Sequence, residues 1–261
     1  MKRIKVLFRQ LAKKRRTGLI AYLTCGDPGI AESVEIALAL EQAGADALEL
    51  GAPFSDPIAD GPVIQAASQR SLERGTTIAD VLEIAKSIRA RSGIPLIVFS
   101  YLNPILRYGI ERFAGEAAAA GVDGVLFTDL PPEAAKEIRS TLHAAGLGAI
   151  FLAAPTSTDE RLARIDRASD GFVYYVSTTG VTGARRELDA ELVERLEAVR
   201  AKLRNPVAVG FGISEREHYL ALEGKCDAVV VGSAIVRAIA EGEPSSAAMR
   251  AAEVVRRILG N

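Results

Sequence analysis

Residues 43–62 read Ala-Gly-Ala-Asp-Ala-Leu-Glu-Leu-Gly-Ala-Pro-Phe-Ser-Asp-Pro-Ile-Ala-Asp-Gly-Pro. A glycine turn ends a helical segment, a short apolar strand follows over 47–51, and a loop rich in turn residues comes next. Glu49 interrupts the strand, where desolvation raises the pKa of its carboxyl group, whereas Asp60 among turn residues is expected to stay ionised. Two carboxyl groups in such different surroundings point to proton transfer. The alternative is that a hydrogen bond holds a buried Glu49 and that Asp60 only shapes a turn.

The order of helix, glycine turn and strand recurs along the chain. Eight short apolar runs alternate with helical stretches at a spacing of about 25 to 35 residues, and most are nearly continuous, as in parallel strands buried on both faces. The predicted strands are 19–24, 47–51, 96–101, 124–128, 149–153, 172–177, 207–210 and 228–232, and the predicted helices include 30–42, 78–91, 132–145 and 190–203. Eight such units close more readily into an α/β fold of the (β/α)8 TIM barrel type than into an open sheet.

The whole chain fits one barrel. Its 261 residues contain no linker, low-complexity tract or second domain, so 1–261 is expected to be a single (β/α)8 domain. The first 16 residues are rich in Lys and Arg, but their apolar residues Ile4, Leu7, Phe8 and Leu11 fall on one helical face. We therefore expect an N-terminal helix that covers the barrel floor rather than a targeting segment.

Composition limits the partners. Lysine and arginine number 32 against 33 acidic residues, which gives a net charge of -1 and no electrostatic reason to expect nucleic acid or a membrane. No segment is long and apolar enough to cross a bilayer. Cys25 and Cys226 are far apart and form no metal-binding motif, which favours a reducing cytoplasm and argues against a metal site.

Glycine pairs near the end of the chain predict a phosphate site. Residues 210–213 read Gly-Phe-Gly-Ile after the seventh strand, and 232–235 read Gly-Ser-Ala-Ile after the eighth. These loops commonly bind phosphate in such barrels through backbone N–H groups and a helix N-terminus. Residues 180–183, Gly-Val-Thr-Gly, follow the sixth strand and could close over the same anion as a lid. The predicted phosphate ligands are the N–H groups of Gly183, Gly212, Gly232 and Ser233.

Missing residue types narrow the chemistry. No lysine ends a strand, which argues against a Schiff base or a pyridoxal phosphate anchor. His143 and His218 fall on predicted helices and are expected to be satisfied surface residues. Cys25 lies at the mouth without a histidine near it, so packing explains it better than nucleophilic catalysis. Glu49 and Asp60 remain as the acid and base.

Three strings of the chain resemble the α subunit of tryptophan synthase. They are residues 48–65, 180–183 and 210–214, and the likeness extends from Tyr22 to Val236. The resemblance implies a (β/α)8 lyase that cleaves indole-3-glycerol phosphate into indole and glyceraldehyde 3-phosphate. It also implies an α2β2 complex in which indole passes through a tunnel to the β subunit. Pyridoxal phosphate is expected in that β partner, and no cofactor is expected in this chain.

The resemblance assigns roles to individual residues. Glu49 and Asp60 match the catalytic pair, Tyr174 matches an active-site tyrosine, and Thr182 resembles a lid threonine that contacts the aspartate. Tyr22 and Tyr101 resemble residues that line the pocket, although each tyrosine could instead pack in the core.

The resemblance also places the residues Ser55, Asp56 and Pro57 at the mouth that faces the β subunit. Arg185 and Arg186 follow the lid and have no assigned role, and a solvated pair of charges is the simpler interpretation.

Two other functions remain open at this point. A different barrel enzyme acting on a phosphorylated sugar would share the glycine site but would not need the loop at 55–57, and an assay of indole release separates it. A non-catalytic chain that only activates its β partner would show partner activation without cleavage of its own.

Overall fold

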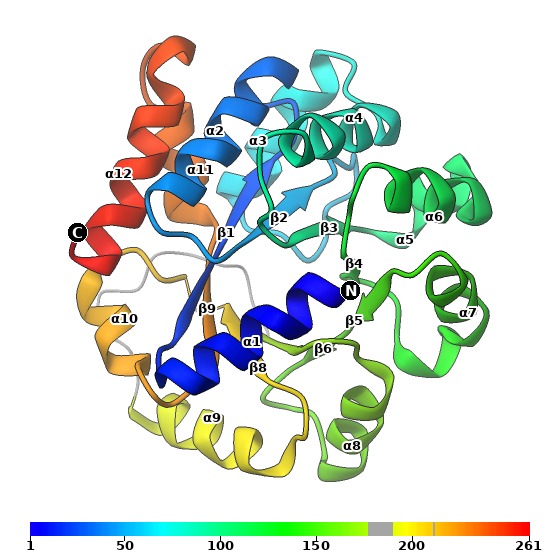
Figure 1. Cartoon of the computed structure of the whole chain (residues 1–261), viewed down its shortest axis with the longest axis vertical. Helices are drawn as coiled ribbons and strands as arrows, with labels where there is room; N and C mark the ends of the chain where they lie inside the picture. The colour runs from blue at the N-terminus through cyan, green and yellow to red at the C-terminus, as the bar shows by residue number, and fades with distance from the viewer. Residues whose placement is uncertain (177–189, 211) are drawn as a thin grey trace.

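The structure is a computed structural model that describes residues 1–176, 190–210 and 212–261, and its strands pair in parallel throughout (Figure 1). Each predicted strand is present, with ends within one or two residues of those expected. The strands are β1 (Gly18–Thr24), β2 (Ala47–Gly51), β3 (Leu96–Ser100), β4 (Gly124–Phe127), β5 (Gly148–Ile150), β6 (Leu152–Ala153), β7 (Val173–Val176), β8 (Val207–Gly210) and β9 (Ala228–Val231).

The sheet closes through one divided strand. The strand order is β5-β4-β3-β2-β1-β9-β8-β7-β6, so the sheet begins and ends on two segments that only Phe151 separates. β5 pairs with β4, β6 pairs with β7, and the Phe151 carbonyl accepts the N–H of Tyr174 at 3.1 Å. The predicted strand 149–153 is therefore one barrel strand, or stave, whose first part pairs with β4 and whose second part pairs with β7. Counted this way the barrel has eight staves, which confirms the predicted (β/α)8 fold.

The described helices form an outer ring around the strands, apart from α1, which crosses the end of the barrel (Figure 1). They are α1 (Lys2–Lys14), α2 (Ile30–Gln42), α3 (Pro62–Glu73), α4 (Ile78–Arg89), α5 (Leu102–Tyr108), α6 (Ile110–Ala119), α7 (Lys136–Ala144), α8 (Asp159–Ala168), α9 (Ala190–Lys202), α10 (Arg216–Leu222), α11 (Ser233–Ala240) and α12 (Ala247–Leu259). The predicted helix 132–145 differs most, because a 3-10 turn over Pro132–Ala134 precedes α7. Within the described ranges, no helix has both the length and the apolar character needed to cross a membrane.

A repeated aspartate explains the helix, turn and strand pattern seen in the sequence. Asp46, Asp123 and Asp227 each precede a strand, and each carboxylate accepts the N–H of a residue at the start of a neighbouring strand. These donors are Leu19 (2.8 Å to Asp46), Leu96 (3.2 Å to Asp123) and Val207 (2.8 Å to Asp227). Each aspartate also pairs with an arginine, namely Arg16, Arg89 and Arg200 respectively. The repeat is therefore a device that joins neighbouring staves at the barrel floor.

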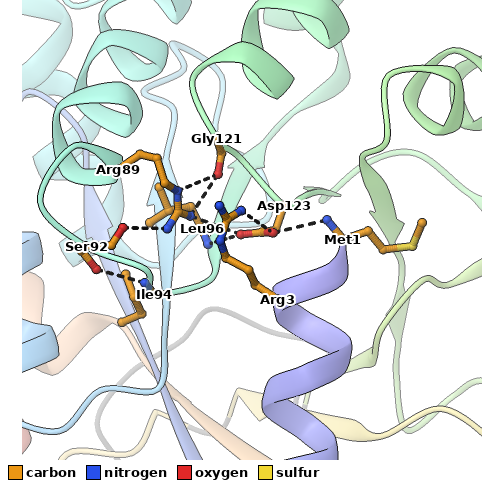
Figure 2. Close-up of polar contacts among 8 residues, drawn as sticks. All are labelled: Met1, Arg3, Arg89, Ser92, Ile94, Leu96, Gly121 and Asp123. Carbon is orange, nitrogen blue, oxygen red and sulfur yellow. Dashed lines mark hydrogen bonds and ion pairs between the residues drawn. The ribbon is translucent and has the colours of Figure 1, made fainter.

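The covering helix predicted over residues 1–16 is α1, which crosses the ring of strands in Figure 1. Its buried residues Ile4, Phe8 and Leu11 pack on the interior side chains, with the Phe8 and Phe172 rings 5.4 Å apart. Asp123 ties this helix to the barrel (Figure 2). The donors to this buried carboxylate include Arg3 (3.2 Å), the Met1 ammonium (3.4 Å) and Arg89 (3.2 Å). The floor of the barrel is thereby sealed against water.

The strand register divides the upper interior into layers. Because barrel strands tilt, residues from alternate strands share a level, four to a layer. Three successive layers follow one another from the floor side toward the mouth. The lowest contains Glu49, Leu126, Tyr174 and Val230, and the middle one contains Tyr22, Phe99, Leu152 and Gly210. The layer at the mouth contains Gly51, Thr128, Val176 and Gly232. The carboxyl group of Glu49 thus lies two layers below the mouth.

Candidate active site

Glu49 projects from β2 into the barrel and is 0% exposed. Its register neighbours are Tyr22 on β1 and Ile97 on β3. Neither carboxyl oxygen has a hydrogen-bond partner among the residues that the structure describes. Burial is therefore not offset, and it raises the pKa of Glu49 to about 8. The carboxyl group is mostly protonated at neutral pH, and the described residues do not supply the hydrogen bond that a purely structural role required.

Asp60 ends the loop between β2 and α3 and is half-buried. The Tyr101 hydroxyl donates to its Oδ2 at 3.2 Å and accepts the N–H of Ala59 at 2.8 Å. Burial raises the pKa of Asp60 to about 6, although the bond from Tyr101 opposes this shift. The pKa of Asp60 is thus shifted although turn residues surround it, because the loop folds back onto Tyr101. Asp60 is nevertheless ionised by about ten to one at pH 7.

Tyr22 and Tyr174 lie inside the barrel beside the carboxyl groups. The Phe99 ring packs edge-on against both, at 5.3 Å from Tyr22 and 6.5 Å from Tyr174. Burial raises the pKa of both phenols, and the negative charges of Asp60 and Glu49 add to the shift. The two hydroxyl groups therefore stay protonated and can donate hydrogen bonds into the pocket.

Two glycines make room for these tyrosines. A Cβ on Gly51 would collide with the Tyr22 hydroxyl, and a Cβ on Gly210 would collide with that of Tyr174. Sequence reasoning treated Gly210 as part of the phosphate loop and overlooked Phe99 and Gly51. A signal was available, because all three residues fall at the inward-facing positions of their strands.

The predicted phosphate residues lie at two neighbouring turns of the mouth. Gly212 has φ of +66°, a left-handed conformation that favours glycine. Gly232 precedes Ser233, the first residue of α11. The first N–H groups of a helix have no partner within it and can bind an anion. The described residues 212–214 and 232–236 include no lysine or arginine, and Arg257 of α12, which reaches the first turn, donates to the Ser214 carbonyl at 3.2 Å. Anion binding here would therefore depend mainly on the backbone.

The loop after β2 carries the residues expected to meet a partner. Ser55 and Asp56 are exposed, and the Ser55 hydroxyl donates to the Asp56 carboxylate at 2.5 Å. Ile58 is 88% exposed. The N–H of Asp60 donates to the carbonyl of Pro57 at 3.1 Å, so the exposed tip and the buried carboxylate belong to one turn.

Some predicted residues fall outside the structure. Thr182 and Gly183, together with Arg185 and Arg186, lie outside the described residues.

The histidines and the mouth cysteine stand apart from Asp60 and Tyr101. Cys25 is buried, which raises the pKa of its thiol. His143 is bonded to Asp170 at 2.6 Å, and His218 is buried rather than at the surface as expected, with Nδ1 accepting the N–H of Ser214 at 3.4 Å. In the part of the chain that the structure describes, no three His, Cys, Asp or Glu residues are grouped to hold a metal.

We predict that Glu49→Gln stabilises the protein increasingly as pH rises from 5 to 8. The folded-state pKa of Glu49, about 8, lies above the ordinary value of 4.5, so the folded wild type retains a proton that the unfolded chain has lost. Wild-type stability therefore falls through this pH window, whereas glutamine does not titrate.

Urea unfolding at pH 5 and pH 8 measures the effect. The control is Glu83→Gln, an exposed change on α4, which is expected to stay within about 0.5 kcal/mol of wild type at both pH values. A constant difference between wild type and Glu49→Gln across this window would contradict the raised pKa.

The chain matches known proteins over most of its length. A family model described as "Tryptophan synthase alpha chain" covers residues 8–259. The alpha chain of Solibacter usitatus is 53% identical over 247 residues, which cover 95% of this chain and 92% of that protein. The alpha chain of Xylella fastidiosa is 48% identical over 255 residues, covering 97% and 95% respectively.

Solved structures agree in fold and sequence. A chain from the tryptophan synthase α2β2 complex of Pyrococcus furiosus has a TM-score of 0.88 and 44% identity, with 94% of this chain and 98% of that chain covered. The alpha chain of Legionella pneumophila subsp. pneumophila has a TM-score of 0.89 and 34% identity, with coverage of 98% and 95%. The chain belongs to the tryptophan synthase alpha chain family.

Proposed function

We propose that Glu49 and Asp60 perform the proton transfers of this family's lyase reaction, the cleavage of indole-3-glycerol phosphate into indole and glyceraldehyde 3-phosphate. One observation carries the proposal. Two carboxyl groups of unlike burial belong to β2 and the loop that follows it, one with a pKa of about 8 and the other of about 6. At neutral pH the first is an acid and the second an anion, as the reaction requires. The Glu49 carboxyl, which has no hydrogen-bond partner among the described residues, also argues against a chain that only activates its partner.

The proton transfers balance over one turnover. Protonated Glu49 gives its proton to the ring carbon that bears the glycerol chain, which leaves positive charge on the indole nitrogen. The Asp60 carboxylate stabilises that charge. Glu49, now ionised, removes the proton of the adjacent side-chain hydroxyl, the C–C bond breaks, and its electrons return to the ring. The reaction needs no cofactor in this chain; the pyridoxal phosphate of the complex belongs to the β subunit.

The tyrosines have supporting roles in this proposal. Tyr101 holds Asp60 through the 3.2 Å hydrogen bond and fixes its direction. Tyr22 and Tyr174 supply protonated hydroxyls and aromatic walls to the pocket.

Glu49→Gln should abolish indole release, and Asp60→Asn should reduce it severely. A loss of at least about a hundredfold in kcat is expected for either variant, because general acid and base groups contribute on that scale. For wild type, kcat/KM should rise as Asp60 ionises near pH 6 and fall as Glu49 ionises near pH 8.

Indole release measured between pH 5 and 9 tests both points. Circular dichroism serves as the control for folding of the variants. Wild-type rates in Glu49→Gln, or a flat pH profile, would contradict the assignment.

The phosphate of the substrate is held by the backbone in this proposal. Its oxygens accept the N–H groups around Gly212, Gly232 and Ser233, with Gly183 added from outside the described residues. The position of Gly232 and Ser233 at the start of α11, and the lack of lysine and arginine among residues 212–214 and 232–236, support this.

Gly232→Ala should raise KM at least about tenfold with little loss of stability. Its φ of -116° is outside the left-handed region, and the new Cβ would stand 3.6 Å from the nearest atom, the Cβ of Tyr22, an ordinary contact at the mouth. Gly212 makes a poorer test, because its left-handed backbone would strain any side chain.

Steady-state kinetics and binding of glycerol phosphate measure this effect. Gly115→Ala on α6, where nothing lies within 4 Å of the added methyl group, is the matched control and should leave KM unchanged. Unaltered binding of glycerol phosphate by Gly232→Ala would refute the site.

The partner of this chain is the tryptophan synthase β subunit, as in the α2β2 complex of Pyrococcus furiosus. Within that complex we propose that Ser55, Asp56 and Pro57 contact the β subunit. The exposure of the loop tip and its continuity with Asp60 support this, because docking on the tip can reposition the carboxylate. We propose further that residues 1–261 act as one domain and that the complex is cytoplasmic.

Asp56→Ala should leave the activity of the isolated chain unchanged and reduce its stimulation by saturating β subunit. The reason is that the Asp56 side chain is exposed and bonds to Ser55, so its loss leaves Asp60 in place. The test compares cleavage rates of wild type and Asp56→Ala with and without β subunit, and the affinity of each for the β subunit. Equal stimulation of both proteins at unchanged affinity would remove Asp56 from the coupling.

A further inference from the structure

Thr128 carries a buried hydroxyl at the mouth of the barrel that the mechanism above does not use. It follows the last residue of β4, and its N–H donates to the carbonyl of Ser100 at 3.1 Å, which continues the β4 pairing. Like Gly124 and Leu126, it occupies an inward-facing position of the stave. Its oxygen is buried, yet it has no hydrogen-bond partner among the described residues. A buried hydroxyl without a partner is unusual and calls for an explanation.

The surroundings of this hydroxyl tie it to the acid and base. Ser100 pairs with Phe127 in the register, so Thr128 lies beside Tyr101. The Thr128 hydroxyl lies near enough to the Tyr101 phenol to lower its pKa slightly, although the two oxygens are not in hydrogen-bond geometry. Tyr101 in turn holds Asp60. Glu49 is on the second stave, Tyr101 follows the third and Thr128 follows the fourth. Tyr101 therefore lies between Glu49 and Thr128 around the barrel.

The layers of the barrel also indicate how a bound substrate is oriented. Thr128 shares the mouth layer with Gly51, Val176 and Gly232, and in a barrel of eight staves the fourth stave lies opposite the eighth. A substrate whose phosphate binds at Gly232 therefore extends its aromatic end toward Thr128.

Ring geometry selects one position on that aromatic end. The indole nitrogen has two neighbouring carbons, C2 and C7a. C2 leads to C3, the carbon that Glu49 protonates, so it must face the second stave. C7a leads to C7, which projects to the other side of Asp60, where Thr128 lies.

We propose that Thr128 is a specificity-determining residue whose hydroxyl hydrogen-bonds a polar substituent at C7, so that the enzyme accepts 7-hydroxyindole and the corresponding glycerol phosphate as substrates. This inference rests on the proposed roles of Glu49, Asp60 and the phosphate turns. A site that pairs a hydroxyl of its own with one on the ligand discriminates through that bond. Substituents at C5 point away from Asp60 and do not reach Thr128.

The test is the condensation of glyceraldehyde 3-phosphate with indole, 5-hydroxyindole or 7-hydroxyindole, the reverse of cleavage. Wild type, Thr128→Val and Thr128→Ser are compared through the ratio of kcat/KM for each hydroxyindole to that for indole. The ratio cancels any change in Asp60 that is common to all three substrates, and comparison of the ratio between the proteins cancels the electronic effect of the substituent.

For 7-hydroxyindole the ratio should fall about fivefold or more in Thr128→Val and be kept in Thr128→Ser, as expected for one hydrogen bond. For 5-hydroxyindole it should be the same in all three proteins. An unchanged ratio in Thr128→Val, or an equal fall for both hydroxyindoles, would overturn the proposal. Thr128→Ala replaces the valine variant if that variant does not fold. Failure of wild type to consume indole would instead count against the proposed function.

Discussion

Closure of the sheet at residues 148–153 is the constraint on which the rest of this structure depends. One stave serves both β4 and β7, because its first part pairs with β4 and its second part, beyond Phe151, pairs with β7. Closure removes every sheet edge and makes inward-facing positions dry. A glutamate in the middle of β2 is buried only because of that closure. The raised pKa of Glu49 is thus a property of the barrel as a whole rather than of its neighbours in the sequence.

The two ends of the barrel use carboxylates in opposite ways. At the floor, Asp46, Asp123 and Asp227 are surrounded by donors and arginines, and they join staves together. Nearer the mouth, Glu49 has no donor among the described residues, and Asp60 has the bond from Tyr101. Satisfied carboxylates stabilise a fold, whereas unsatisfied ones cost stability and gain reactivity. The contrast follows the usual division of such barrels into a stabilising and a catalytic end.

The sequence alone predicted those features of the fold that depend on short-range patterns of apolar and polar residues. The strands, the covering helix and the burial of Glu49 follow from apolar periodicity, and they match the structure closely. Contacts between distant segments could not be predicted in the same way. Asp60 is shielded because Tyr101, 41 residues away, bonds to it. Gly51 is required because Tyr22 of another strand needs its space. Thr128 is informative only when the register sets it beside Tyr101. Tertiary packing determines the surroundings of Asp60, Gly51 and Thr128. The turn residues near them in the sequence gave no indication of these long-range contacts.

The separation of the two pKa values arises from burial rather than from repulsion between the carboxyl groups. Desolvation is the main cause for both residues, and the difference lies in depth and in the hydrogen bond that only Asp60 receives. In the complex, a partner that covers the mouth removes water from the loop at 55–60. This removal of water alone raises the pKa of Asp60 further. Stimulation of cleavage at neutral pH therefore requires that docking also brings donors to Asp60 or tightens its bond to Tyr101. Mere exclusion of water would protonate the anion on which the reaction depends.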